Sequence, residues 1–244
     1  MLDGIVDRLG AVRRSFEAVL DLGCFDAALP MPARARVVRS DPGFGWARAA
    51  GGVQADEDRL PFADASFDLV VSAGVLDQVD DLPGALALIR RVLRPDGLFL
   101  GALVGAGSLP MLRAALRSAE GERPVARLHP GVDVRAAGDL LQRAGFALPV
   151  ADVETLDAGY RDVGRLLDDL RGSASSNILV GRRPIGRAAL AATASAFGRS
   201  GDGERTRERF TLLFLTGWAP DPSQPRAARR GSATASLAAA LPPR

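Results

Sequence analysis

Short apolar runs alternate with amphipathic stretches along most of this chain, and the alternation predicts a series of strands and helices. Apolar residues recur every three or four positions over residues 3–17, which predicts a helix there. Ser66–Ala73 is a continuous apolar run, as is typical of a parallel strand that is covered on both faces. Three shorter runs of this kind predict further strands at Val19–Leu22, Arg36–Arg39 and Val53–Ala55.

The next part of the chain repeats this order of elements. Leu82–Leu93 carries its apolar residues on one side, which predicts an amphipathic helix. Arg94–Gly97 predicts a turn, and Leu98–Val104 a fifth strand. A short turn of helix is also expected at Phe25–Leu29, before two prolines. Strands that alternate with helices through short connections indicate a doubly wound parallel sheet.

Helical patterns prevail after Val104. Helices are expected at 109–118, 134–144, 161–170 and 186–197, and strands at 150–156 and 209–218. The last strand is strongly apolar and is expected at or near an edge of the sheet. We interpret residues 1–218 as one domain, in which elements between 106 and 200 form a helical substrate cap. Residues 219–244, rich in Pro, Ala and Arg, are expected to form a partly disordered tail.

The composition is that of a globular protein. Hydrophobic residues make up 47% of the 244 residues, enough for a sizeable core. No apolar run approaches the roughly 20 residues that cross a bilayer. The N-terminal residues lack the apolar stretch of a signal peptide. These features predict a soluble, cytoplasmic protein without a transmembrane segment.

Three residue types that are absent or rare here exclude several chemistries. All 31 basic residues are Arg, which excludes a phosphate-loop lysine and a Schiff-base lysine. One Cys and one His exclude a cysteine-based zinc site and an iron site with two His ligands. No metal site is therefore expected, and His129, which precedes a proline, is interpreted as a loop residue. The net charge is only +2, and the Arg clusters contain no interleaved aromatic residues, so no nucleic-acid partner is expected.

Polar residues follow the predicted strands at their carboxyl ends, where ligands bind in open α/β sheets. They are Asp21 and Gly23 after the first strand, Asp41 after the second, Asp56 and Glu57 after the third, and Ser72 in the fourth. Asp41 lies 20 residues beyond Asp21, the spacing of an acid that accepts hydrogen bonds from both ribose hydroxyls of a nucleotide. Asp56 is expected to accept a hydrogen bond from an adenine amine.

Each acid also has a structural interpretation. Asp41 precedes Pro42 and is suited to cap a following helix. Asp56 and Glu57 lie in an acidic loop that is simply polar. Asp21 is harder to explain in this way, because an unpaired carboxylate within an apolar strand is costly.

The order of these motifs resembles the class I S-adenosylmethionine-dependent methyltransferases. The matching segments are DLGC, VVRSD and ADEDRLPFADASFDLVVSAGVLDQVDDLPGALALIRRVLRPDGLFLGAL. The resemblance implies a Rossmann-like α/β fold, with a seven-stranded sheet, helices on both faces and an antiparallel last strand. It also implies S-adenosylmethionine as the cofactor, bound by the residues at the strand ends: Asp21, Gly23, Asp41, Asp56, Glu57 and Ser72. Asp21 then either organises the loop or binds the methionine amino group, and no catalytic residue is assigned.

A narrower resemblance extends over nearly the whole chain. LFLGALVGAGSLPMLRAALRSAE, DLLQRAGFALPVADVETL, RLLDDLRGSASSN and TGWAPDPSQPRAARRGSATASL are similar to one group of proteins. This group comprises the mitochondrial complex I assembly factor described as an arginine hydroxylase and its alphaproteobacterial relatives. The resemblance implies a protein substrate, the iron–sulfur subunit of complex I next to the quinone site, with an arginine as the modified residue. Peripheral association with the membrane is compatible with this role.

Two departures from the family pattern keep alternatives open. Phe25 stands where a second glycine would let the backbone approach the ligand. Leu76-Asp77-Gln78 replaces the family's usual Leu-(His)-Trp after the fourth strand. The alternatives are a methyltransferase acting on malonyl carrier protein, which shares only the first half of the pattern, and a non-catalytic assembly chaperone. The loop after the first predicted strand is a poor match to the glycine motif of a nicotinamide-dependent oxidoreductase. Methyl transfer and arginine hydroxylation both stay open as the reaction.

Overall fold

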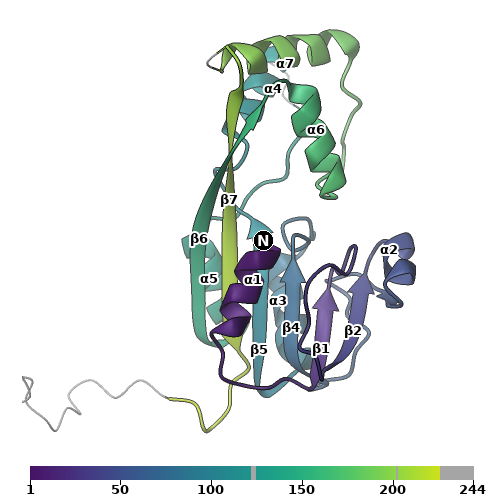
Figure 1. The fold of residues 1–244 in the computed structure, drawn as a ribbon, viewed down its shortest axis with the longest axis vertical. Helices are drawn as coiled ribbons and strands as arrows, with labels where there is room; N and C mark the ends of the chain where they lie inside the picture. The colour runs from purple at the N-terminus through teal and green to yellow at the C-terminus, as the bar shows by residue number, and fades with distance from the viewer. Residues whose placement is uncertain (122–124, 202, 226–244) are drawn as a thin grey trace, which may run out of the picture.

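A mixed seven-stranded sheet forms the centre of the molecule (Figure 1). The computed structural model describes residues 1–121, 125–201 and 203–225, so residues 226–244 of the expected tail lie outside the described residues. The strands are β1 (Ala18–Leu22), β2 (Arg36–Asp41), β3 (Val53–Gln54), β4 (Phe67–Ala73), β5 (Leu93–Val104), β6 (Ala147–Tyr160) and β7 (Thr206–Trp218). Their order is β3-β2-β1-β4-β5-β7-β6, and β7 is antiparallel to both its neighbours. The expected sheet with an antiparallel last strand is confirmed.

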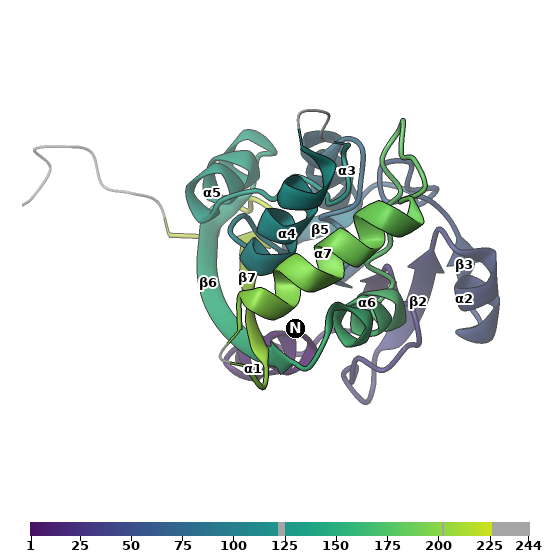
Figure 2. The same ribbon diagram turned by 90° about the horizontal axis from the view of Figure 1, so that it is seen from above.

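Helices cover both faces of this sheet, as expected (Figure 2). They are α1 (Leu2–Gly10), α2 (Phe44–Ala49), α3 (Leu82–Val92), α4 (Pro110–Glu120), α5 (Val134–Arg143), α6 (Val163–Gly172) and α7 (Arg187–Arg199). On one face, Ile5 of α1 packs in a buried cluster with Val19 and Phe214. On the other face, Leu86 of α3 and Leu141 of α5 belong to the larger core cluster. In the part of the chain that the structure describes, no helix has the length and apolar character needed to span a membrane.

Beyond the sheet, β6 and β7 continue as a two-stranded ribbon that carries the helical cap (Figure 1). β7 pairs with β5 only from Trp218 to Leu212, but it pairs with β6 as far as Thr206. The cap consists of α4, α6 and α7, whose apolar side chains form a separate cluster. α5 also lies between residues 106 and 200, but it packs on the sheet instead of the cap.

A buried carboxylate joins the ribbon to the cap. Glu208 of β7 is fully buried and accepts hydrogen bonds from the backbone N–H groups of Met111 (3.2 Å) and Leu112 (2.8 Å). These groups lie in the first turn of α4, where backbone N–H groups have no partner within the helix. The residue preceding α4, Leu109, offers no side-chain cap. Glu208 therefore satisfies the start of α4 and fixes it on β7.

The N-terminal part of the chain differs from the prediction in two places. α1 ends at Gly10, and the following residues are not helical up to residue 17. Val12 and Phe16 nevertheless pack in the cluster under α1, so their spacing reflects burial from an irregular segment. The helical turn expected at Phe25–Leu29 is absent, because φ is +45° at Phe25 and +56° at Ala27, values that a right-handed helix excludes.

Two segments at the lower end of the sheet also differ from the prediction. Arg94–Gly97 was expected to be a turn before the fifth strand, but it is an irregularity within β5, where the pairing with β4 shifts its register. Ala219 was expected in the tail, yet it is buried and exchanges backbone hydrogen bonds with Gly97 and Asp96. The chain beyond β7 is therefore anchored on β5 at this point.

Candidate functional site

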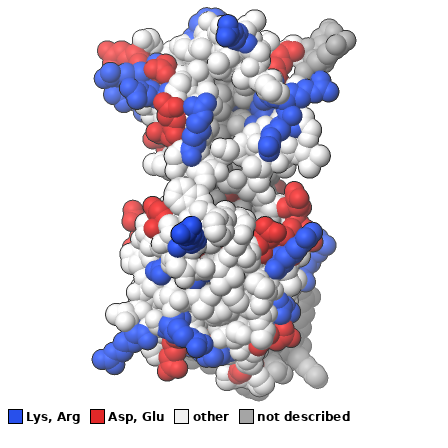
Figure 3. Space-filling model, turned by 90° about the vertical axis from the view of Figure 1, so that its right-hand side faces the viewer, with Lys and Arg blue, Asp and Glu red and all other residues white. Residues whose placement is uncertain are grey.

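A cavity of about 800 Å³ lies between the carboxyl edge of the sheet and the cap. Figure 3 shows the surface narrowing between these two parts, with mainly uncharged residues at the waist. The walls come from the loops that follow β1, β2 and β4 on one side, and from α4, β6 and α6 on the other. β1 lies between β2 and β4, so the strand order reverses there, and open α/β sheets bind ligands at this point.

Asp41, the last residue of β2, is buried and lines this cavity. Its carboxylate accepts hydrogen bonds from the backbone N–H groups of Phe25 (2.9 Å) and Gly43 (2.8 Å). Asp41 therefore ties the loop after β1 to the segment before α2, but it does not cap this helix, whose N-cap residue Gly43 receives no side-chain cap. A carboxylate offers about four acceptor positions. Two of them stay available for the hydroxyl groups of a ligand.

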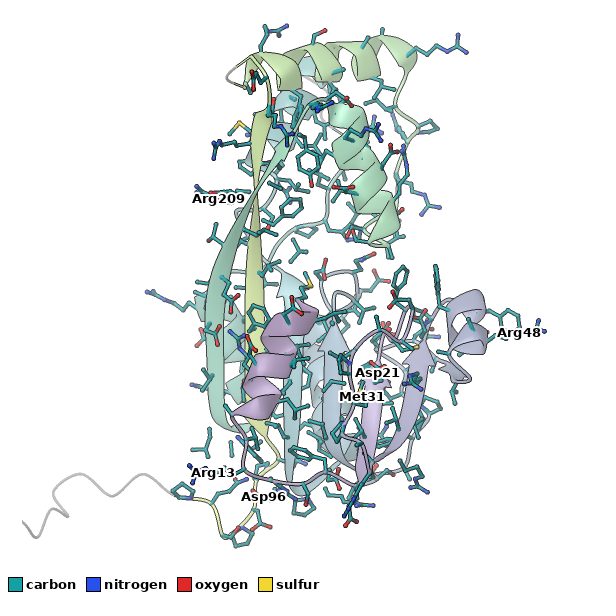
Figure 4. The ribbon with its side chains drawn as sticks, viewed as in Figure 1. Arg13, Asp21, Met31, Arg48, Asp96 and Arg209 are labelled. Atoms are coloured by element: carbon teal, nitrogen blue, oxygen red, sulfur yellow. The ribbon has the colours of Figure 1, made fainter. Side chains whose placement is uncertain are left out.

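Asp21 of β1 lies at the carboxyl edge of the sheet (Figure 4) and also lines the cavity. Its Oδ2 is 3.6 Å from Nε of Arg39 on the neighbouring strand, which is too far for a hydrogen bond, and it has no hydrogen-bond partner. Burial raises the pKa of Asp21 to about 6, with Arg39 acting in the opposite direction and Asp41 adding to the rise. A buried acceptor of this kind in a cavity wall is suited to a ligand donor.

The loop after β1 keeps the backbone of a glycine-rich loop, although two positions carry side chains. Gly23 has a φ of +72°, and a Cβ there would collide with the side chain of Val75. Phe25 and Ala27 also have positive φ, the region that favours glycine. The Phe25 ring packs against Trp46 with 4.2 Å between the ring centroids, and both rings line the cavity. Phe25 thus adds an aromatic wall where a glycine would leave space.

The other three predicted site residues do not line the cavity. Asp56 is exposed, two residues beyond β3. Glu57 is buried without a partner for Oε1, and this burial raises its pKa to about 7. Ser72 is fully buried within β4, and its Oγ has no hydrogen-bond partner. Of the predicted set, the structure therefore brings together Asp21, Gly23 and Asp41, at the carboxyl ends of β1 and β2.

Several further polar residues line the cavity, although the sequence did not predict them as site residues. Tyr160, at the end of β6, is hydrogen-bonded to Asp169 of α6, and its burial raises the pKa of the phenol to about 12. His129 does lie in a loop, as expected, but it also lines the cavity, and its Nε2 accepts a hydrogen bond from Ile178 N (3.3 Å). Asp77 lines the cavity from the loop after β4. No local signal marks Tyr160 or His129 as cavity residues, because contacts with the ribbon and the cap place them there, whereas Asp77 follows β4 at the same sheet edge as the predicted residues.

Comparisons with known proteins agree with this geometry. A family profile described as "Methyltransferase domain" matches residues 14–101. The mitochondrial arginine hydroxylase NDUFAF5 of Danio rerio is 35% identical over 96% of this chain and 78% of its own length. The malonyl-[acyl-carrier protein] O-methyltransferase of a Methylovorus strain is 35% identical over 73% of this chain and 66% of its own length.

The fold is also similar to that of solved structures. The YcgJ protein of Bacillus subtilis superimposes with a TM-score of 0.64, over 91% of this chain and 100% of YcgJ. The sequence identity is only 14%, so this likeness concerns the fold alone.

Proposed function

The chain belongs to the S-adenosylmethionine-dependent methyltransferase superfamily, and within it to the family of the arginine hydroxylase NDUFAF5; on this basis we propose that it modifies an arginine of a protein substrate and assists the assembly of respiratory complex I. The extent of the similarity carries this proposal. Similarity to the vertebrate NDUFAF5 proteins covers 96% of this chain and so includes the cap, whereas similarity to carrier-protein methyltransferases covers 72–80%. The proposed substrate is the iron–sulfur subunit next to the quinone site, met in the cytoplasm at the membrane surface.

S-adenosylmethionine is the cofactor of this superfamily, and the residues of the cavity fit it. Asp41 has acceptor positions for the two ribose hydroxyls, and the unpartnered Oδ2 of Asp21 suits the amino group of the methionine part. Gly23 turns the chain with a positive φ, and its lack of a side chain would let the cofactor approach the backbone there. When bound, the cofactor supplies a methyl group activated by its sulfonium. Contacts from Asp56 to the adenine amine, and from Glu57 and Ser72, stay predictions.

Deleting the gene from its host is expected to lower the amount of assembled complex I. If the chain modifies the iron–sulfur subunit, the arginine modification should also disappear from that subunit. Native gel electrophoresis measures the first effect and mass spectrometry the second, and the mass of the modification distinguishes a methyl from a hydroxyl group. Biotin auxotrophy with normal complex I would reject the proposal in favour of the carrier-protein methyltransferase.

Complementation of the deletion strain tests whether the arginine modification is needed for complex I assembly. The wild-type gene should restore both complex I and the modification, whereas a variant that does not bind the cofactor should restore neither. Restoration of complex I by such a variant, with the arginine still unmodified, would identify a non-catalytic chaperone.

Replacing both Phe25 and Ala27 by glycine is expected to tighten cofactor binding by about three- to tenfold, equivalent to roughly 0.7–1.4 kcal/mol. The reason is that the Phe25 ring narrows the cavity beside the loop after β1, where the ligand would approach the backbone. Stability should fall slightly, since losing a ring contact such as Phe25–Trp46 costs about 0.5–1.5 kcal/mol. Isothermal titration calorimetry with S-adenosylmethionine measures the affinity.

Ala27→Gly alone is the matched control, because it relaxes a positive φ and leaves the ring in place. It should leave the affinity close to that of the wild type. If the single and the double variant gained the same affinity for the cofactor, the Phe25 ring would not be what weakens binding.

A further inference from the structure

One carboxylate of the cavity has no part in the cofactor contacts proposed above. Asp77 lies in the turn after β4, which Gln78 closes by donating its backbone N–H to Val75 O (2.9 Å). Leu76, its neighbour, is almost fully buried in the larger core cluster and so anchors the turn. These contacts hold Asp77 at the cavity wall, near Val104 at the end of β5.

One oxygen of the Asp77 carboxylate lacks a hydrogen-bond donor. Its Oδ1 is buried and has no partner. Burial raises the pKa of Asp77, while the backbone N–H groups of Asp77 and Val104 and the imidazole of His129 act in the opposite direction. A partly buried carboxylate with a buried, unpartnered oxygen is stabilised by a ligand that brings N–H groups or a positive charge.

The arginines that line the same cavity are already engaged. Arg113 donates from Nε to Ser108 O (3.0 Å) and from Nη2 to His129 O (2.8 Å). Arg127 donates from Nε to Glu120 Oε1 (2.6 Å). These two guanidinium groups therefore already donate to protein acceptors, whereas Oδ1 of Asp77 has no donor, so this part of the wall favours a ligand that donates hydrogen bonds.

We propose that Asp77 binds the guanidinium group of the acceptor arginine and orients it toward the cofactor. This rests on the proposed function, because it takes an arginine side chain as the group that is modified. Asp21 lies in β1 and Asp77 in the turn after the neighbouring strand β4, so the guanidinium lies beside the cofactor in one crevice. A carboxylate accepts two parallel N–H bonds from the guanidinium fork, which explains selection against neutral side chains of the same size.

Binding of small arginine probes tests this assignment. Nα-acetylarginine methylamide and its citrulline counterpart, which is similar in size but uncharged, are titrated calorimetrically into protein saturated with S-adenosylhomocysteine. The wild type should bind the arginine probe at least tenfold more tightly than the citrulline probe. Asp77→Asn should lose this preference, with the arginine probe weakened by roughly ten- to hundredfold because a charge-assisted bond is lost.

Asp80→Asn is the matched control, since Asp80 lies in the same loop but is exposed. It should keep the preference of the wild type, and both variants should keep their affinity for S-adenosylhomocysteine. Loss of that affinity in Asp77→Asn would assign Asp77 to the cofactor site and overturn the proposal. Equal binding of the two probes by the wild type, no binding up to their solubility limit, or an unchanged preference in Asp77→Asn would also overturn it.

This experiment also separates the failure of this proposal from a failure of the proposed function. Loss of the probe preference in Asp77→Asn, combined with normal complex I after gene deletion, would leave Asp77 as a guanidinium site and reject the assembly role. Loss of complex I on deletion, with no effect of Asp77→Asn on the binding of either probe, would support the assembly role and reject Asp77 as a guanidinium site.

Discussion

Replacing Asp41 by alanine is expected to weaken S-adenosylmethionine binding by about two to four orders of magnitude. If Asp41 binds the ribose as proposed, the variant loses the acceptors for both ribose hydroxyls, and each charge-assisted hydrogen bond contributes about 1.5–3 kcal/mol. It also releases the backbone N–H groups of Phe25 and Gly43, which Asp41 holds at the edge of the cavity. Calorimetric titration of the purified wild type and variant measures the loss.

Asp41→Asn separates the two contributions. Its amide oxygen can still accept from one backbone N–H group, but it has lost the negative charge and half of the acceptor capacity. We expect an intermediate affinity, with thermal unfolding close to that of the wild type. An affinity of Asp41→Ala equal to that of the wild type would remove Asp41 from the cofactor site.

Replacing Glu208 by alanine is expected to lower the free energy of unfolding by about 2–5 kcal/mol. The substitution leaves the N–H groups of Met111 and Leu112 without an acceptor at a buried helix start. Each buried group left unsatisfied costs about 1–3 kcal/mol. Urea denaturation followed by circular dichroism measures the change, provided that the slope with denaturant stays constant.

Two controls on the same residue and strand sharpen this test. Glu208→Gln keeps one oxygen acceptor and should lose less stability than the alanine variant. Arg209→Ala removes an exposed ion pair to Asp157 (3.3 Å), and such pairs contribute about 0–1 kcal/mol. If Glu208→Ala were no less stable than Arg209→Ala, Glu208 would not be what fixes α4 on β7.

The local pattern located most of the central elements to within one or two residues. The predicted strand Ser66–Ala73 is β4 at Phe67–Ala73, and the predicted helix Leu82–Leu93 is α3 at Leu82–Val92. Continuous apolar runs and amphipathic patterns carry this information, because the burial of each element depends on its own residues. The prediction of a helix over 3–17 was wrong in its second half, where Phe16 is buried and Val12 partly buried without a helix.

The sequence by itself determined which polar residues end the strands, and hence that Asp21, Gly23 and Asp41 meet at one edge of a parallel sheet. Only the tertiary structure decided that Asp56, Glu57 and Ser72 stay off the cavity wall, and that Asp77 and His129 reach it. Their places depend on contacts across long stretches of chain, such as His129 with Ile178 and Glu208 with the start of α4. The ribbon of β6 and β7 creates these contacts by carrying the cap over the strand ends. A contact of this kind cannot be predicted from the hydrophobic pattern of either segment, because a residue's neighbours along the chain do not determine its partner in space.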